Sequence, residues 1–327
     1  MVEYRKGKKS MCTSLKLKYK DNYVFGRNLD LEYHFNEGVI TIKETYLMKY
    51  KFLKEETVNK KIMGIGSLID NYPLFAEAMN EDGLCIAGLN YPGNAYYYED
   101  TQENKINLAP YELINYLLIN AKTVDEVKKL SQNIHLVAKS FKEGLPLSYL
   151  HYLISDKDKS IVLEPDIDGI KIYDNPYEVL TNNPSFPFHL ENIKQYGNLS
   201  NKYYLNNLTS KSDLKPYCIG LNAHGLPGDS SSPSRFIKTL YLKERMEETL
   251  SINDNLVNEA FHILASVGVI KGAALTSENK SEITIYTSVL DPINFVYYYK
   301  TYEEMSIKKI EYSSIDFKDT KIMYFKL

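Results

Sequence analysis

A cysteine close to the start of the chain combines a nucleophile with a group that can act as a base. Cys12 follows Met11 and begins a segment in which polar and apolar residues alternate. If the preceding residues are removed, its thiol and a free α-amine belong to one residue. The ordinary pKa of an α-amine is about 7.7–8.0, so this amine can accept a proton near neutral pH without a histidine. The thiol can attack a carbonyl carbon; alternatively, Cys12 is a small buried residue of a strand.

Four more segments carry polar side chains that suit the same chemistry. They contain two arginines, one aspartate and two asparagines, namely Arg27, Asp30, Asn90, Asn182 and Arg235. Each has an ordinary alternative as part of a surface ion pair, a turn or a helix cap. Together they would supply cations, a carboxylate and side-chain amides that donate to an oxyanion. The sequence therefore indicates a nucleophilic site with oxyanion donors.

Other catalytic chemistries lack their motifs. The chain has no G-x-S-x-G, H-E-x-x-H, GxxxxGK[ST] or G-x-G-x-x-G segment. Its 6 histidines show no metal-ligand spacing. The 3 cysteines, Cys12, Cys85 and Cys218, are too few for a four-cysteine zinc site or a disulfide framework. We therefore predict no metal and no cofactor.

Composition narrows the class of protein. The 327 residues carry a formal net charge of −3, which argues against a nucleic-acid-binding protein. The longest strongly apolar run, residues 261–270, is about half of the length that a membrane-spanning helix needs. Residues 11–20 alternate between polar and apolar types and form no hydrophobic block, so we recognise no secretory signal. A cytoplasmic protein that binds no membrane is expected.

Periodicity and turn residues predict a segregated α+β fold. The predicted strands are 13–17, 23–26, 39–43, 75–79, 84–89, 149–155, 160–164, 170–173, 178–181, 282–290, 294–302, 306–312 and 321–326. One predicted helix starts at Pro110, and three others cover 124–131, 233–250 and 253–267. Strands, helices, strands, helices and strands follow one another along the chain. This order fits two antiparallel sheets packed between helical layers.

The motifs together resemble the choloylglycine hydrolase family, which comprises bile salt hydrolases and penicillin V acylases. The resemblance rests on MCTS (11–14), FGRNLD (25–30), MNEDGL (79–84), AGLNYP (87–92), LTNNPSF (180–186), GLPGD with SS and SRF (225–236), YTS (286–288) and YYYKTY (297–302). It extends from Cys12 nearly to the C-terminus. It implies a four-layer αββα fold of the N-terminal-nucleophile hydrolases and hydrolysis of a linear amide C–N bond without a cofactor.

The resemblance also implies a role for each polar residue. The implied catalytic residues are Cys12, Arg27, Asp30, Asn90, Asn182 and Arg235. Cys12 would be the nucleophile, Arg27 would face its thiolate and lower the thiol pKa, and Asp30 would be the hydrogen-bonding partner of the α-amine. The two asparagines would be oxyanion or orienting amides, and the second arginine would complete the site.

The first eleven residues depart from the family pattern. Family members commonly begin at Met-Cys, whereas ten residues precede Met11 here. We expect residues 1–11 to be a propeptide or a mis-assigned start that is removed, and residues 12–327 to form a single choloylglycine hydrolase-like domain. The alternative is a retained extension, which would leave a catalytically silent steroid- or acyl-binding relative with a capped Cys12.

Asn90 also bears on the substrate. Bile-salt-type members resemble this chain in having Asn at that position, whereas penicillin-V-type members tend to have Tyr. The favoured function is therefore hydrolysis of glycine- or taurine-conjugated bile salts, with a penicillin V or N-acyl-homoserine-lactone acylase as the alternative. The residues expected to border the substrate, unless they belong to the ordinary core, are Tyr33, Phe35, Ile65, Leu68 and Ile69. The resemblance further implies a homotetramer, for which the tyrosine-rich residues 294–302 are expected to offer surface.

Overall fold

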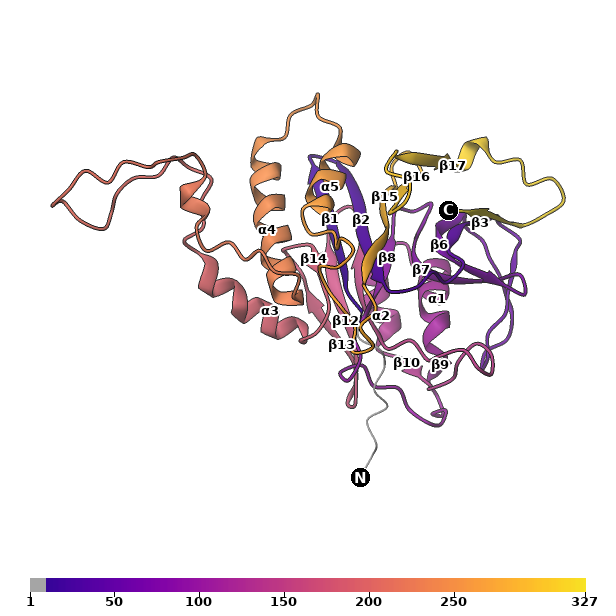
Figure 1. Cartoon of the computed structure of the whole chain (residues 1–327). Helices are drawn as coiled ribbons and strands as arrows, with labels where there is room; N and C mark the ends of the chain where they lie inside the picture. Colours follow the sequence, from indigo (N-terminus) through magenta and orange to yellow (C-terminus); the bar gives the residue numbers. More distant parts are fainter. Residues whose placement is uncertain (1–9) are drawn as a thin grey trace.

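The structure, a computed structural model, describes residues 10–327 and contains two large antiparallel sheets (Figure 1). The first sheet has the order β14 (Val179–Leu180), β1 (Cys12–Tyr19), β2 (Asn22–Leu31), β15 (Ile283–Asp291), β16 (Val296–Thr301) and β17 (Lys308–Glu311). The second has the order β13 (Gly169–Asp174), β12 (Ser160–Asp166), β11 (Leu150–Ser155), β8 (Cys85–Asn90), β7 (Tyr72–Asn80), β6 (Ile62–Ile69), β3 (Gly38–Ile42) and β18 (Ile322–Lys326). Two short pairs are β4 (Leu47–Met48) with β5 (Glu56–Thr57) and β9 (Ile106–Leu108) with β10 (Ile134–Leu136).

Helices cover the outer faces of the two sheets. The helices are α1 (Leu113–Asn120), α2 (Val124–Ser131), α3 (Phe186–Ile193), α4 (Ser232–Thr249) and α5 (Leu256–Ala265), with 3-10 turns η1 (Pro110–Glu112), η2 (Lys194–Tyr196), η3 (Leu221–Ala223) and η4 (Tyr312–Ser314). α4 and α5 pack on the outer face of the six-stranded sheet, and their apolar residues belong to one continuous cluster with the core between the sheets. Apolar residues of α1 and α2 form a second core on the far face of the eight-stranded sheet. The layers are therefore αββα, as expected from the sequence.

The second strand is longer than its pattern predicts. β2 extends from Asn22 to Leu31, so Arg27 and Asp30 lie inside the strand and not at its end. Eight of its residues, including these two, are buried in succession. β2 lies between β1 and β15, is covered by α5 on one face and meets the other sheet on the opposite face. Because both faces are covered, the alternation that marks a half-exposed strand is lost.

Among the longer elements, β6 and α3 were not predicted from the sequence. β6 contains Gly64 and Gly66, which weaken a strand pattern. A Cβ atom at Gly64 would lie 2.1 Å from the carbonyl oxygen of Glu77, so β7 approaches too closely for any side chain there. The register between these strands shifts after Ile65, where Ala76 of β7 is an extra residue and forms a β-bulge. The glycines are thus explained only by the neighbouring strand.

A long excursion separates η2 from α4. The arm, residues 198–231, extends away from the layered body (Figure 1, left). Residues 294–302 do not offer the exposed surface that was expected of them. β16 lies inside its sheet, and Val296, Tyr297 and Tyr299 are buried. Large apolar side chains are exposed on the arm instead. Within residues 10–327, no helix combines the length and the apolar character that crossing a membrane requires.

Candidate active site

The structure places Cys12 between the two sheets. It is the first residue of β1, and its side chain is buried in the core that the sheets share. Arg27 lies on the adjacent strand β2, and its Nη2 donates to the Cys12 Sγ over 3.0 Å. The guanidinium is itself 1% exposed, so this contact is shielded from water. A positive charge held against a thiol at this distance stabilises the thiolate.

Burial and charge act in opposite directions on the thiol. Burial raises the pKa of Cys12 above its ordinary value, and the charge of Arg27 lowers it by a smaller amount. Backbone N–H groups of Asn90 and Asp30 also lower it, while the carboxylate of Asp30 raises it. Arg27 therefore acts in the expected direction, but desolvation outweighs it and the pKa of the thiol is raised.

Asp30 lies beside the same residue on β2. Its Oδ1 accepts a 2.6 Å hydrogen bond from the Thr284 hydroxyl, and its backbone N–H donates to the carbonyl oxygen of Met11 over 3.1 Å. Its Oδ2 is buried and has no hydrogen-bond partner among residues 10–327. Burial raises the pKa of Asp30 to about 6, against the lowering effects of Arg235 and Thr284. An unpaired buried acceptor is costly, so this oxygen is suited to a donor such as an α-ammonium group.

Asn182 and Arg235 hold the backbone of the nucleophile. The Asn182 Oδ1 accepts from the backbone N–H of Cys12 over 2.7 Å and from the Arg235 Nη2 over 2.8 Å. Its Nδ2 donates to the carbonyl oxygen of Asn90 over 2.7 Å. Arg235 also donates through Nη1 to the Cys12 carbonyl oxygen and to the Thr13 hydroxyl. Both ends of the Asn182 amide contact residues that surround Cys12, so this geometry gives it an orienting role.

The last two residues of the extension lie across the site. Asn90 donates through Nδ2 to the Ser10 hydroxyl, so that amide is engaged by the extension. The backbone N–H of Met11 donates to the Glu282 Oε1 over 2.5 Å. Burial raises the pKa of Glu282 to about 7. The other residues of the predicted propeptide, 1–9, lie outside the described residues.

Two carboxylates near the site were not singled out in the sequence. Glu282 precedes β15 and contacts Met11, and Glu77 of β7 forms an ion pair with the Arg27 Nη1 over 3.1 Å. Glu77 is the one charged residue of β7 and has apolar residues on both sides, just before the MNEDGL segment. An isolated acid in an apolar run is a sequence signal for a buried carboxylate. Glu282 has no comparable local signal, because it follows the mostly polar residues 276–281 and does not interrupt an apolar run.

The expected substrate-bordering residues do not form one group. Ile65 is fully buried in the core that contains Cys12, and Phe35 packs against that core. Leu68 packs against the second core, on the other face of the sheet. Tyr33 is 47% exposed, and Ile69 is half-buried at the end of β6.

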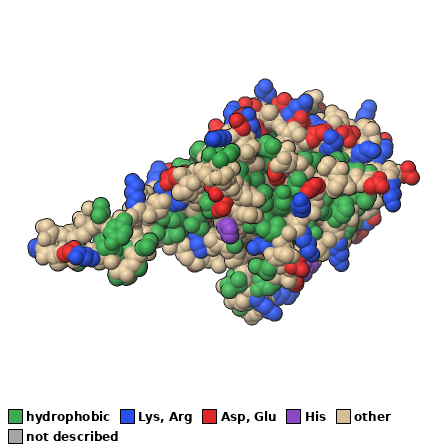
Figure 2. Space-filling model, turned by 90° about the horizontal axis from the view of Figure 1, so that it is seen from above, with side chains coloured by type: hydrophobic (Ala, Val, Ile, Leu, Met, Phe, Trp, Pro, Cys, Tyr) green, Lys and Arg blue, Asp and Glu red, His purple; other side chains and the backbone are tan. Residues whose placement is uncertain are grey.

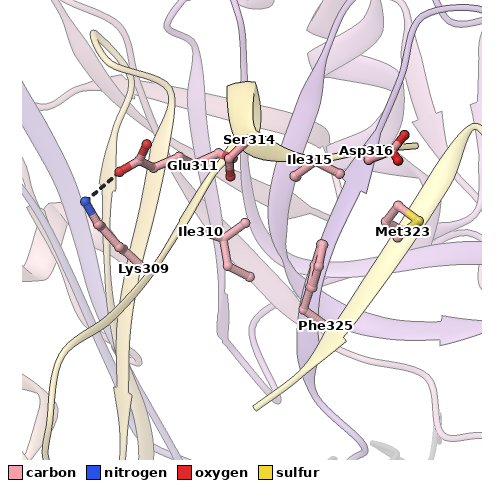
Figure 3. A pocket seen from close by; sticks show the side chains of 8 residues that line it. All are labelled: Lys309, Ile310, Glu311, Ser314, Ile315, Asp316, Met323 and Phe325. Carbon is pink, nitrogen blue, oxygen red and sulfur yellow. Dashed lines mark hydrogen bonds and ion pairs between the residues drawn. The ribbon is translucent and has the colours of Figure 1, made fainter. Parts of the chain in front are cut away.

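A surface pocket with several apolar lining residues lies elsewhere on the molecule. A cavity of about 380 Å³ opens between β17 and β18, and Ile310, Met323 and Phe325 line it beside the Lys309–Glu311 ion pair (Figure 3). None of the predicted site residues lines it. Within the part of the chain that the structure describes, no group of three or more His, Cys, Asp or Glu residues could hold a metal ion. The chemistry-bearing side chains gather at Cys12.

Known proteins are similar to this chain in sequence and in fold. The profile of the linear amide C–N hydrolases, choloylglycine hydrolase family, matches residues 12–324. A bile salt hydrolase/transferase of Lactiplantibacillus plantarum is 41% identical over 317 residues, which cover 97% of each chain. A crystal structure of a mutant conjugated bile acid hydrolase from Clostridium perfringens superimposes with a TM-score of 0.91 at 36% identity and covers 97% of each chain. Penicillin V acylase from Agrobacterium tumefaciens shares the fold, with a TM-score of 0.72 at 17% identity over 93% of this chain and 87% of that chain. The chain therefore belongs to the choloylglycine hydrolase family of linear amide C–N hydrolases.

Proposed function

We propose that this protein is a cysteine amidohydrolase that cleaves glycine- or taurine-conjugated bile salts to the free bile acid and the amino acid. The observation that carries the proposal is the 3.0 Å contact between the Arg27 guanidinium and the Cys12 thiol inside a hydrolase-type αββα fold. Relatives at 41% and 36% identity over 97% of the chain bear the name bile salt hydrolase/transferase, which supports the substrate class.

The proposed mechanism uses one residue twice. With residues 1–11 absent, the α-amine of Cys12 accepts the thiol proton, and Sγ attacks the amide carbonyl carbon of the substrate. Asn90 donates to the developing oxyanion, a contact typically worth about 2.7–4 kcal/mol. The α-ammonium then protonates the leaving amine as the C–N bond breaks and a thioester remains. Water, deprotonated by the amine, hydrolyses the thioester and restores the thiol.

Removal of residues 1–11 is part of the proposal. Cys12 N is an amide nitrogen in the structure and donates to Asn182, so it is not a base while Met11 is attached. Ser10 also engages the Asn90 amide that the mechanism needs. The family profile begins to match at residue 12. Asp30 Oδ2, which lacks a hydrogen-bond partner within residues 10–327, would accept from the α-ammonium.

A retained extension would favour a different function. The contacts of Ser10 and Met11 would then cap the site, and the protein would be a silent steroid- or acyl-binding relative. Intact-mass measurement after expression of the full reading frame distinguishes the two. A chain that begins at Cys12 supports the hydrolase, and a chain that keeps residue 1 supports the binding protein.

The substrate is tested by comparing the rates at which the protein hydrolyses two different amides. Purified protein that begins at Cys12 should release glycine from glycocholate at least as fast as it releases the side-chain acid from penicillin V, because Asn90 stands where bile-salt-type relatives have Asn. Faster turnover of penicillin V would move the assignment to a penicillin V acylase. An N-acyl-homoserine lactone serves as the third substrate in the same assay.

The proposal includes a homotetramer in the cytoplasm. The homotetramer is supported by large apolar side chains that are exposed on the arm, namely Tyr203, Leu205, Leu208, Tyr217 and Ile219. Figure 2 shows hydrophobic side chains along this protrusion, away from the body. Several large apolar side chains exposed on one protruding segment are typical of a contact with another protein chain. Fractionation of the natural host, with the protein in the cytoplasmic fraction, is the expected result for location.

A further inference from the structure

Residues of the eight-stranded sheet accept hydrogen bonds from the Arg27 guanidinium. Its Nη1 donates to the carbonyl oxygens of Ala76 and Gly88 over 3.1 and 3.0 Å, and to the Glu77 Oε2 over 3.1 Å. Its Nη2 donates to the Cys12 Sγ. Ala76 is the bulged residue of β7, so the bulge supplies one of these carbonyls next to the acid that pairs with the arginine.

Glu77 has a complete shell of donors. Its Oε1 accepts from the Ser288 hydroxyl over 2.9 Å and the Tyr297 hydroxyl over 2.5 Å. Its Oε2 accepts from Arg27 and from the Tyr286 hydroxyl over 2.8 Å. All these residues except Arg27, at 1%, have no exposed surface. An ionised carboxylate has about four acceptor sites, and here each one has a donor.

The hydroxyl groups around Glu77 come from two sequence segments that have no role in the proposed mechanism. Tyr286 and Ser288 belong to the YTS segment, and Tyr297 opens the YYYKTY segment. Both segments lie in the six-stranded sheet, and Glu77 lies in the eight-stranded sheet. The carboxylate therefore joins the sheets directly behind the arginine that faces the nucleophile.

We propose that Glu77 is a positioning residue that fixes the orientation of Arg27 and sets how much of its positive charge reaches the Cys12 thiol. A buried arginine without a counter-ion would be strongly disfavoured, and a misplaced one would leave Sγ unsupported. With Glu77 and Asp30 ionised, the charges of Arg27 and Arg235 are balanced, which leaves the interior suited to a thiolate paired with an α-ammonium. The inference rests on the proposed role of Cys12 as nucleophile.

The test measures the thiol itself, so it needs no substrate. The rate of Cys12 alkylation by iodoacetamide is followed against pH on the Cys12 peptide by mass spectrometry, because Cys218 is exposed and also reacts. The charged and titratable groups around this thiol are Arg27 and Asp30 of β2, Glu77 of β7, Arg235 of α4, Glu282 before β15 and Tyr286 of β15. Variants at Glu77 and its shell leave the other groups in place.

Two variants have opposite expected effects. Glu77→Gln keeps the shape but removes the negative charge, so the midpoint of the alkylation profile should move to lower pH by at least about 0.5 unit. A charge in contact range shifts a pKa by about 1–3 units, and Glu77 reaches the thiol only through Arg27, which contacts both groups. The thiolate of lower pKa is a weaker nucleophile, so kcat should fall more than KM changes. Tyr297→Phe removes a donor, leaves the carboxylate less screened and should move the midpoint slightly to higher pH.

A matched control removes a buried carboxylate far from the site. Glu112 has no exposed surface and accepts from the backbone N–H groups of Ala109 and Lys51 in the outer layer, so Glu112→Gln should lower stability without moving the midpoint. A folded Glu77→Gln protein whose midpoint stays in place or rises overturns the inference. If Glu77→Gln does not fold, an unmoved midpoint in Tyr297→Phe overturns it. A failure on glycocholate with the expected alkylation shifts would instead contradict only the proposed substrate.

Discussion

At the scale of single residues, Cys12 is asked to supply both a thiol and an amine, and substitutions separate the two. Cys12→Ala keeps the amine and should abolish glycine release from glycocholate. Cys12→Ser should reduce it by orders of magnitude, because a hydroxyl is far less acidic than a thiol with an ordinary pKa of about 8.5. Cys85→Ala and Cys218→Ala are the controls and should retain turnover, since neither residue can carry a free α-amine. Turnover by Cys12→Ala would rule out Cys12 as the nucleophile.

The amine can be tested without touching the thiol. A variant with one unremovable residue ahead of Cys12 keeps every site residue, and its new amide N–H can still donate to Asn182 as in the structure. An amide nitrogen is not basic, so hydrolysis should be nearly absent compared with the chain that begins at Cys12. If the blocked chain works at the unblocked rate, a histidine must supply the base. His224, which is exposed at the end of η3, would be the first to replace.

Residues with a local signature could be predicted, and residues defined by distant partners could not. Cys12, Arg27 and Asp30 stand in short segments that resemble a family, and the structure brings all three together. Glu77 acquires its role from hydroxyl groups more than two hundred residues away along the chain. Glu282 likewise meets Met11 across 271 positions. No pattern of spacing in one sequence specifies such contacts.

At the scale of elements, the same limit explains why β6 was missed while α2 was predicted with its observed bounds. Thr123 caps α2 by accepting from the Glu126 backbone N–H, and that signal is contained in four consecutive residues. The glycines of β6 lower its strand propensity, and they are required only because β7 bulges against them. Local chemistry specifies a cap, whereas tertiary packing specifies a glycine.

This packing predicts a sharp difference between two glycines. Gly64→Ala would place a Cβ atom 2.1 Å from the Glu77 carbonyl oxygen, so β7 would have to shift. We expect a loss of about 2–3 kcal/mol in the free energy of unfolding, which lowers Tm by about 3–4 °C in a chain of this length. Gly197→Ala is the control: it has no neighbour within 4 Å and a helical φ of −62°, so its Tm should stay the same or rise slightly. A Gly64→Ala protein with unchanged Tm would contradict the close approach of the strands.

At the scale of the whole molecule, the order of elements predicted the layered α+β architecture, and the resemblance predicted its αββα arrangement. The assignment of strands to sheets was not predictable, because neighbours such as β2 and β15 are separated by most of the chain. The arm was not predicted either. Its residues carry turn formers and polar side chains that specify no element, and its apolar side chains find no core of their own.

Assembly is therefore expected to depend on the arm. Light scattering at micromolar concentration should give about four times the mass of one chain. Leu208→Ser with Ile219→Ser should lower that mass, because these side chains are 83% and 92% exposed on one chain and would be buried in a contact. Ile167→Ser, on a turn of the body and 62% exposed, is the control and should leave the mass unchanged. A monomer of the unaltered protein would defeat the proposal.

The ion pair between Arg27 and Glu77 also limits how this architecture can diversify. Because it ties β2 to β7 across the interior, the sheets cannot slide past each other without disconnecting the nucleophile from its arginine. Accommodation of a differently shaped acyl group must then come from the rim, in connections such as residues 32–37 and 91–105, which can lengthen or change while the interior stays fixed. We expect proteins with this architecture to differ far more in the acyl groups that they bind than in their reaction mechanism.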